Sequence, residues 1–165
     1  MGGSVVMLIE LPALWLALLN IVAIPAIHLG ISWCFIRMPA NWFNPDSPFF
    51  RAKNGERGGA IYQSIFKIRS WKGFLPDAAP WFGGFAKGKL KEKDPEYIKD
   101  FIVETCRGEA AHNAQILGIW CTLIWNPWPV AALVMIVYAA LSNFPCLILQ
   151  RYTRARLQRL LDDLR

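Results

Sequence analysis

Four ionisable side chains lie close together in the second half of the chain, directly before a long apolar run: Glu104, Arg107, Glu109 and His112. Ionisable groups near the edge of an apolar segment are costly at membrane depth and tend to be functional. On a helix, Glu109 and His112 fall within roughly 60° of each other at 100° per residue. Glu109 can then hold one imidazole nitrogen while the other takes a proton from an alcohol. The pattern predicts a histidine base oriented by a carboxylate.

Arg107 adds a cation to this group. It follows Glu104 by three residues, so the two side chains can pair on one helix face. Alternatively, its guanidinium can stabilise a developing oxyanion or bind a phosphate or carboxylate through two hydrogen bonds. A simpler interpretation stays open, in which these acids and bases only neutralise one another at the start of an interfacial helix.

The spacing Glu109-x-x-His112 is also typical of carboxylate-bridged metal sites in helical bundles. Such sites usually contain a second copy of the motif, and this chain has only two histidines, His28 and His112. Glu104 and His28 would have to complete the ligand set if the first helix packs alongside. A metal-dependent membrane hydrolase or oxidase is therefore the alternative hypothesis, and the principal hypothesis includes no metal.

Two further groups are candidates for substrate binding. Trp71, Lys72 and Asp77 place an aromatic ring, a cation and an acid in one segment, which suits a headgroup or a sugar. Their alternative role is that of an interfacial anchor. Arg151 and Arg154 follow the last apolar run, where they either bind substrate or form a basic cluster that ends the membrane span.

The elements that must position these residues are long and apolar. Of the 165 residues, 55% are hydrophobic, and mean hydropathy is +0.28. The runs 11–36 and 130–149 are long enough to cross a ~30 Å hydrocarbon core. A third segment, 97–125, has a polar first half, so it either crosses shielded by other helices or is re-entrant. We expect a single all-α integral membrane domain, 1–165, with about three transmembrane helices.

The remaining segments are expected at the membrane surface. The segment 37–96 is rich in Pro, Gly, Trp and Lys and predicts interfacial loops, with one short amphipathic helix over 60–71. Asp94-Pro95-Glu96 is a typical helix start, because Asp caps, Pro suits the first position and Glu favours the positive end of the dipole. The segment 150–165 predicts a basic amphipathic tail.

The positive charges indicate an orientation in the membrane. Thirteen of the 18 Lys and Arg residues lie between 37 and 107, and the other five follow residue 150. The positive-inside rule then places the central segment and the C-terminus in the cytoplasm and the N-terminus outside, in a multi-pass protein of the cell membrane. A net charge of +6 also suits nucleic acid, but these charges flank apolar runs, so no nucleic-acid partner is expected.

A set of short motifs resembles a known family over roughly residues 37 to 161. They are Arg37-Met38-Pro39 with Trp42-Phe43, Arg69-Ser70-Trp71-Lys72, Leu75-Pro76-Asp77, Glu104-Thr105-x-Arg107-x-Glu109-x-x-His112, Asn143-x-Pro145, and Gln150-Arg151-Tyr152-x-Arg154-x-Arg156-Leu157. The chain resembles the glycosyl-diaponeurosporenoate acyltransferases of staphyloxanthin-type carotenoid biosynthesis.

The resemblance implies an enzyme that esterifies a sugar hydroxyl of a glycosylated C30 carotenoid with a fatty acyl group. By that analogy Glu104, Arg107, Glu109 and His112 form the site. The principal hypothesis is therefore a membrane acyltransferase acting on a glycolipid or glycosylated carotenoid, with acyl-CoA or a similar thioester as co-substrate and no other cofactor. A non-enzymatic lipid-binding protein is a further alternative.

Overall fold

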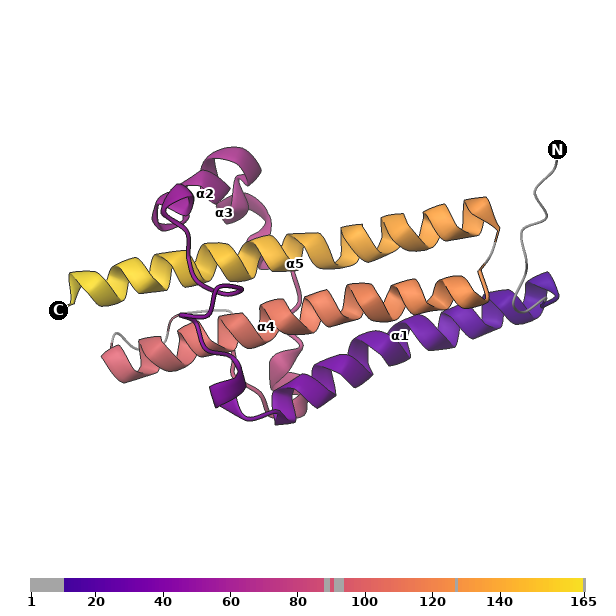
Figure 1. Cartoon of the computed structure of the whole chain (residues 1–165), viewed down its shortest axis with the longest axis horizontal. Helices are drawn as coiled ribbons and strands as arrows, with labels where there is room; N and C mark the ends of the chain where they lie inside the picture. Colours follow the sequence, from indigo (N-terminus) through magenta and orange to yellow (C-terminus); the bar gives the residue numbers. More distant parts are fainter. Residues whose placement is uncertain (1–10, 88–89, 91–93, 127, 165) are drawn as a thin grey trace.

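Three long helices make up most of the chain: α1 (Ala13–Arg37), α4 (Pro95–Cys121) and α5 (Pro129–Asp163). The computed structural model describes residues 11–87, 90, 94–126 and 128–164. The three helices lie side by side, and α4 runs antiparallel to both α1 and α5 (Figure 1). Over the described residues every regular element is helical, which confirms the all-α fold class.

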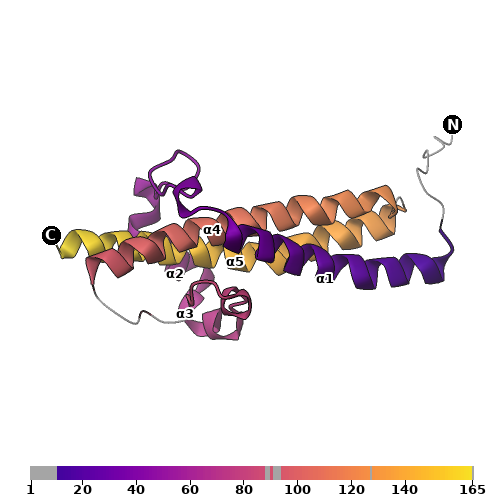
Figure 2. The ribbon, with the colours of Figure 1, turned by 90° about the horizontal axis from the view of Figure 1, so that it is seen from below.

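Shorter helices connect α1 to α4 and α4 to α5. They are η1 (Ala40–Trp42), η2 (Asn54–Gly59), α2 (Ala60–Phe66), α3 (Ile68–Trp71), η3 (Lys72–Phe74), η4 (Ala79–Phe82) and η5 (Thr122–Ile124). Parts of the segment between α1 and α4 lie on both sides of the α4–α5 pair, at the end of the molecule where α5 finishes (Figure 2). This segment therefore surrounds the polar halves of α4 and α5.

Two helices, α1 and α5, are long and apolar enough to cross a membrane. None of the residues of α1 is buried, so its apolar side chains are available to lipid. By contrast, α4 is not apolar enough to qualify. The charged and polar residues of its first half account for this difference, so composition supports two of the three predicted spans. Together, the two apolar helices indicate membrane association.

The start of α4 confirms the predicted cap. The Asp94 carboxylate accepts hydrogen bonds from the backbone N–H groups of Glu96 and Tyr97, at 3.0 and 3.1 Å, and Pro95 occupies the first helical position. These bonds satisfy two of the donors that a helix start leaves unpaired. The first turn of α4 is therefore fixed by its own sequence.

The predicted helix over 60–71 is broken in two. Lys67 adopts a left-handed conformation with φ of 49°, which ends α2 and begins α3. The bend allows Ile68 to pack, fully buried, with Ile148 and Tyr152 of α5. Burial of this side chain offsets the strain at Lys67. A straight amphipathic helix would not turn toward α5 at this point.

Helix α5 is longer than predicted. The expected span 130–149 and the expected tail 150–165 form one continuous helix as far as Asp163. Its second half is anchored by a cluster in which Leu157 packs with Ile98, Phe101 and Ile102 of α4. The basic tail is therefore half of a packed helix pair and carries side chains into the site.

Polar contacts join α1 to the residues after η5, and close packing joins α1 to α4. The side-chain amides of Asn20 and Asn126 exchange two hydrogen bonds, of 2.9 and 3.0 Å, and the Trp125 indole donates to the Asn20 oxygen. A Cβ placed on Gly118 would lie 2.9 Å from Cγ2 of Ile27, so only glycine permits this approach. The parts of the sequence-based predictions that concern residues 1–10, 88–89, 91–93 and 165 lie outside the described residues.

Candidate active site

A cavity of about 1680 Å³ follows one side of the α4–α5 pair. Its wall is built from α1, the segment 58–87 with Leu90, α4 and α5. The polar residues that line it are Ser32, Gln63, Ser64, Arg69, Lys72, Asp77, Lys87, Arg107, His112, Gln115, Gln150, Tyr152, Thr153, Arg156, Arg159 and Asp163. A cavity of this size with mixed polar and apolar walls suits a large amphipathic ligand.

His112 lies on the cavity wall and is held by α5. Its Nδ1 lies 3.0 Å from Oδ1 of Asn143, which is fully buried. The Asn143 amide nitrogen donates to the Ala139 carbonyl and to the Ser142 hydroxyl, both at 3.0 Å, so its oxygen must face the imidazole. An amide oxygen only accepts, so Nδ1 of His112 carries the proton in this contact. In the neutral ring, Nε2 is then the basic nitrogen.

The predicted pairing of Glu109 with His112 is wrong. The Glu109 carboxylate binds the guanidinium groups of Arg151, at 2.9 Å, and of Arg154. Arg154 is almost completely buried, and its other donor reaches the Cys106 sulfur at 3.2 Å. A buried guanidinium requires a carboxylate partner, and this requirement decides where Glu109 points. Glu109 is not among the residues that line the cavity.

Arg151 and Arg154 do not occupy the substrate-binding position predicted for them. Neither lines the cavity. Besides Glu109, Arg151 binds Glu56 at 2.5 Å and the Tyr62 hydroxyl at 3.3 Å. The two arginines thus join the segment after η1 to α4 and α5 through a buried ion network. Both arginines contact carboxylates and other groups of the protein itself. These contacts indicate that the arginines order the site.

The predicted Glu104–Arg107 pair is confirmed, with Nε of Arg107 2.9 Å from the carboxylate. A second nitrogen of Arg107 donates to the carbonyl oxygens of Phe35 and Met38, at 2.7 and 2.6 Å. Those carbonyls lie at the end of α1, where the four-residue helical hydrogen bonds stop and Phe35 accepts only the Met38 N–H from the backbone. Arg107 therefore caps α1 from α4, and it also lines the cavity.

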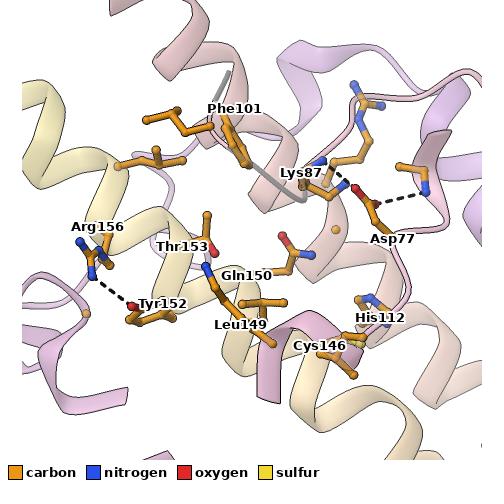
Figure 3. A pocket seen from close by; sticks show the side chains of 18 of the residues that line it. Asp77, Lys87, Phe101, His112, Cys146, Leu149, Gln150, Tyr152, Thr153 and Arg156 are labelled. Atoms are coloured by element: carbon orange, nitrogen blue, oxygen red, sulfur yellow. Dashed lines mark hydrogen bonds between the residues drawn. The ribbon is translucent and has the colours of Figure 1, made fainter. Parts of the chain in front are cut away.

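Lys72 and Asp77 line the cavity as well, whereas Trp71 does not. Trp71 instead donates its indole N–H to the Phe66 carbonyl at 2.6 Å and packs against the cluster around Ile68. Asp77 accepts the backbone N–H of Lys87 at 2.6 Å, which folds this loop over the cavity (Figure 3). Burial lowers the pKa of Lys87, and the nearby charge of Asp77 opposes that shift.

Gln115 places an unpaired acceptor in the same wall. Its side-chain nitrogen donates to the His28 carbonyl, at 3.1 Å, and to the Ser32 hydroxyl, at 3.0 Å. Its side-chain oxygen is buried and has no partner among the described protein atoms. A buried acceptor without a partner is costly, and a ligand hydroxyl would satisfy it.

The alternative metal site is not assembled. Within the described part of the chain, no three His, Cys, Asp or Glu side chains lie close enough together to hold a metal ion. The four predicted ligands have separate partners: Glu104 binds Arg107, Glu109 binds two arginines, His112 contacts Asn143, and His28 contacts the Tyr138 hydroxyl at 3.3 Å. The geometry does not support the metal hypothesis.

Sequence reasoning did not assign a role to Asn143, Gln115 or Lys87. Asn143 carried a signal, since it is one of few polar residues in the apolar run 130–149. Gln115 is likewise an isolated amide within an apolar stretch. Lys87 resembles the lysines that follow it, and only the fold of its loop shows that it lines the cavity.

Comparison with known proteins decides the family. The family model described as glycosyl-4,4'-diaponeurosporenoate acyltransferase matches residues 39–163. The chain belongs to this acyltransferase family. A protein of that name from Staphylococcus aureus strain MRSA252 is 30% identical over 141 residues, which is 84% of each chain. Another, from Staphylococcus haemolyticus, is 29% identical over 134 residues, covering 80% of this chain and 77% of the relative.

Membership in the family confirms the expected resemblance and makes the protein an acyltransferase. The matched region contains the whole of α4 and α5, and therefore His112, Asn143 and the buried ion network. All of α1 lies outside it. No solved structure matches the chain significantly.

Proposed function

We propose that the protein transfers a fatty acyl group from a thioester to a sugar hydroxyl of a glycolipid, with His112 as the general base. The relatives are named for a glycosylated diaponeurosporenoate, so a glycosylated carotenoid is the proposed acceptor. One observation carries the proposal. The Asn143 oxygen contacts Nδ1 of His112 on the wall of a large cavity, which leaves Nε2 as the basic nitrogen.

The reaction needs one proton acceptor and one leaving group. Nε2 of His112 takes the proton from the acceptor hydroxyl while its oxygen attacks the thioester carbonyl. A carbon–oxygen bond forms, the carbon–sulfur bond breaks, and the leaving thiolate takes the proton from the imidazolium. Asn143 keeps the tautomer and ring orientation fixed throughout, a part that a carboxylate plays in many hydrolases.

Other cavity residues would position the two substrates. The unpaired oxygen of Gln115 supports a hydrogen bond from a sugar hydroxyl of the acceptor. Lys72 and Asp77 remain our proposed sugar contacts, since both line the cavity. Arg107, paired with Glu104, holds the end of α1 against the site and acts as a positioning residue.

We also propose a three-span topology, with α4 crossing between α1 and α5 and the charged ends of α4 and α5 in the cytoplasm. The antiparallel arrangement and the distribution of Lys and Arg support this orientation (Figure 1). In a cysteine-free background, Trp128→Cys should react with an impermeant maleimide in intact cells. Asp46→Cys should react only after permeabilisation. The reverse pattern would refute the orientation.

Purified protein in neutral lipid nanodiscs tests the chemistry. Labelled acyl-CoA and acyl carrier protein are each offered with a glycosylated C30 carotenoid acid, and label in the carotenoid fraction is measured. Wild type should transfer label, and His112→Ala should reduce kcat by about 10²–10⁴-fold at an unchanged melting temperature. Asn113→Ala is the matched control, because Asn113 lies on α4 next to His112 and does not line the cavity.

Three outcomes would overturn all or part of the proposal. Equal transfer by wild type and folded His112→Ala would exclude the histidine base. If a membrane lipid extract accepts label and the carotenoid does not, the acyl transfer stands and the carotenoid is excluded as the acceptor. If wild type binds glycolipid but transfers no label from either donor, the non-enzymatic alternative replaces the proposal.

A further inference from the structure

Two arginines converge on one oxygen in the wall of the cavity. Nε of Arg69 and Nη1 of Arg156 both donate to the Tyr152 hydroxyl, at 3.4 and 3.1 Å. Figure 3 shows the bond from Arg156. Both arginines are exposed, whereas Tyr152 is buried. Lys72 and Arg159 line the same cavity. A single neutral oxygen therefore holds two cations close together.

In the part of the chain that the structure describes, this pair has no carboxylate counter-charge, in contrast to the arginines that join α4 and α5. Among the described residues, each of Arg107, Arg151 and Arg154 has a carboxylate within ion-pair distance, and Arg69 and Arg156 have none. Asp163 lines the cavity too but forms no ion pair with them. Two adjacent cations repel each other, and an anion between them removes that cost. Arginines are also suited to grip phosphate through paired hydrogen bonds.

The pair is held in place by the chain around it. Gly59, with φ of 86°, packs so closely that an added Cβ would lie 3.0 Å from Cγ of Arg156 and 3.1 Å from the Tyr152 carbonyl. Arg69 follows Ile68, whose buried side chain fixes α3 against α5. Both guanidinium groups thus extend from backbone that is packed on α5. Such preorganisation lowers the entropic cost of binding a ligand.

The spacing along α5 between Arg156 and the residue that holds His112 suits a ligand of a particular length. Asn143, which holds His112, and Arg156 both lie on α5, and the axial rise between them is about 20 Å at 1.5 Å per residue. The cavity is continuous from His112 to Arg156. A phosphopantetheine arm has this reach between its phosphate and its sulfur. A donor phosphate at the arginines would therefore bring the thioester to His112.

We propose that Arg69 and Arg156 form the phosphate site for a phosphopantetheine-bearing acyl donor. The inference rests on the proposed acyl transfer and specifies its donor class. The same phosphate chemistry is present in coenzyme A and in acyl carrier protein, and an anionic lipid headgroup also carries it. The experiment must therefore separate these sources and must read binding independently of turnover.

Binding is measured first, with free coenzyme A and protein in neutral nanodiscs. The variant is Arg69→Gln with Arg156→Gln. The matched control is Arg37→Gln with Lys53→Gln, which removes the same charge from exposed residues outside the cavity. We expect the cavity variant to weaken coenzyme A binding at least about tenfold and the control to leave it unchanged. Unchanged binding in the cavity variant overturns the phosphate site even if His112-dependent transfer persists.

Turnover gives the second arm. Wild type is compared on acyl-CoA, acyl carrier protein and acyl-N-acetylcysteamine, a thioester without phosphate. The preference for the phosphate-bearing donors, taken as a ratio of kcat/KM values, should fall at least about tenfold in the cavity variant. An equal loss on all three donors overturns the proposal. The proposal is also overturned if the cavity variant loses only its binding to vesicles containing phosphatidylglycerol, because the arginines would then bind lipid headgroups.

Discussion

Asn143 holds His112 across the α4–α5 interface, with 3.0 Å between Oδ1 of the amide and Nδ1 of the imidazole. The amide is itself fixed by two donated hydrogen bonds within α5. The site therefore pairs its histidine with a neutral amide, while the nearby carboxylate of Glu109 serves a buried ion network. A neutral partner costs less to bury than a carboxylate in an apolar helix pair.

Replacing Asn143 tests this relationship. Asn143→Ala should lower kcat at least about tenfold with little change in KM, because the imidazole loses its tautomer and orientation but remains in the cavity. Asn143→Asp retains an acceptor oxygen and should recover part of the activity. Steady-state kinetics on both folded variants provide the measurement. A rise in KM alone would assign Asn143 to substrate binding.

Glu109→Ala should affect stability far more than chemistry. It leaves the buried guanidinium of Arg154 without a carboxylate, which costs about 3–5 kcal/mol of unfolding free energy for a buried pair. Glu96→Ala breaks only the exposed pair with Lys99 and should change stability by at most about 0.5 kcal/mol. Denaturation in micelles measures both.

A double variant separates charge burial from catalysis. Adding Arg154→Met to Glu109→Ala removes the unpaired cation and should restore part of the lost stability. The folded fraction of either variant should keep most of its kcat. Loss of kcat at full stability would return Glu109 to the chemical role that the sequence pattern first indicated.

The sequence predicts helices well here and partners poorly. Apolar runs and the Asp94 cap define α1, α4 and the start of α5 to within a few residues, because these signals are local. The partner of Glu109 depends on Arg154, 45 residues away along the chain. Helical spacing favoured His112 as that partner. The spacing contains no information about the arginines of α5, which are distant in sequence. The break at Lys67 is equally non-local, since burial of Ile68 against α5 causes it.

Because of Lys87, the free energy of unfolding should depend on pH in the alkaline range. Burial lowers its folded pKa below the ordinary value of 10.5, so the unfolded chain binds more protons between the two values. Stability contributed by this group therefore rises with pH through that window, up to about 10.5. Lys87→Met should be relatively more stable than wild type at neutral pH, and the difference should shrink as pH approaches 10.5.

The exposed residue Lys99 provides the control for this effect. Lys99→Met removes one positive charge from an exposed position, where the lysine pairs with Glu96, and it measures the background effect of that loss of charge. Melting temperatures across the alkaline range compare the three proteins. A difference between wild type and Lys87→Met that is constant with pH would place the Lys87 ammonium group in solvent.

Two glycines in long helices should respond in opposite ways to alanine. At Gly118 an added Cβ would lie 2.9 Å from Cγ2 of Ile27 and 3.1 Å from Cδ1 of Ile31, so Gly118→Ala should push α1 away from α4. Such overpacking typically costs about 1–3 kcal/mol. At Gly30 nothing lies within 4 Å, so Gly30→Ala should be neutral or mildly stabilising.

The consequence for activity follows from what α1 contributes to the site. Ser32 and Phe35 line the cavity, and the α1 carbonyl of His28 holds the Gln115 amide. A displaced α1 should therefore release Gln115, and Gly118→Ala should raise the KM for the acceptor while Gly30→Ala leaves it unchanged. Thermal melting and acceptor kinetics in nanodiscs measure both variants. Equal behaviour of the two variants would show that α1 does not pack on α4 at Gly118 in the membrane.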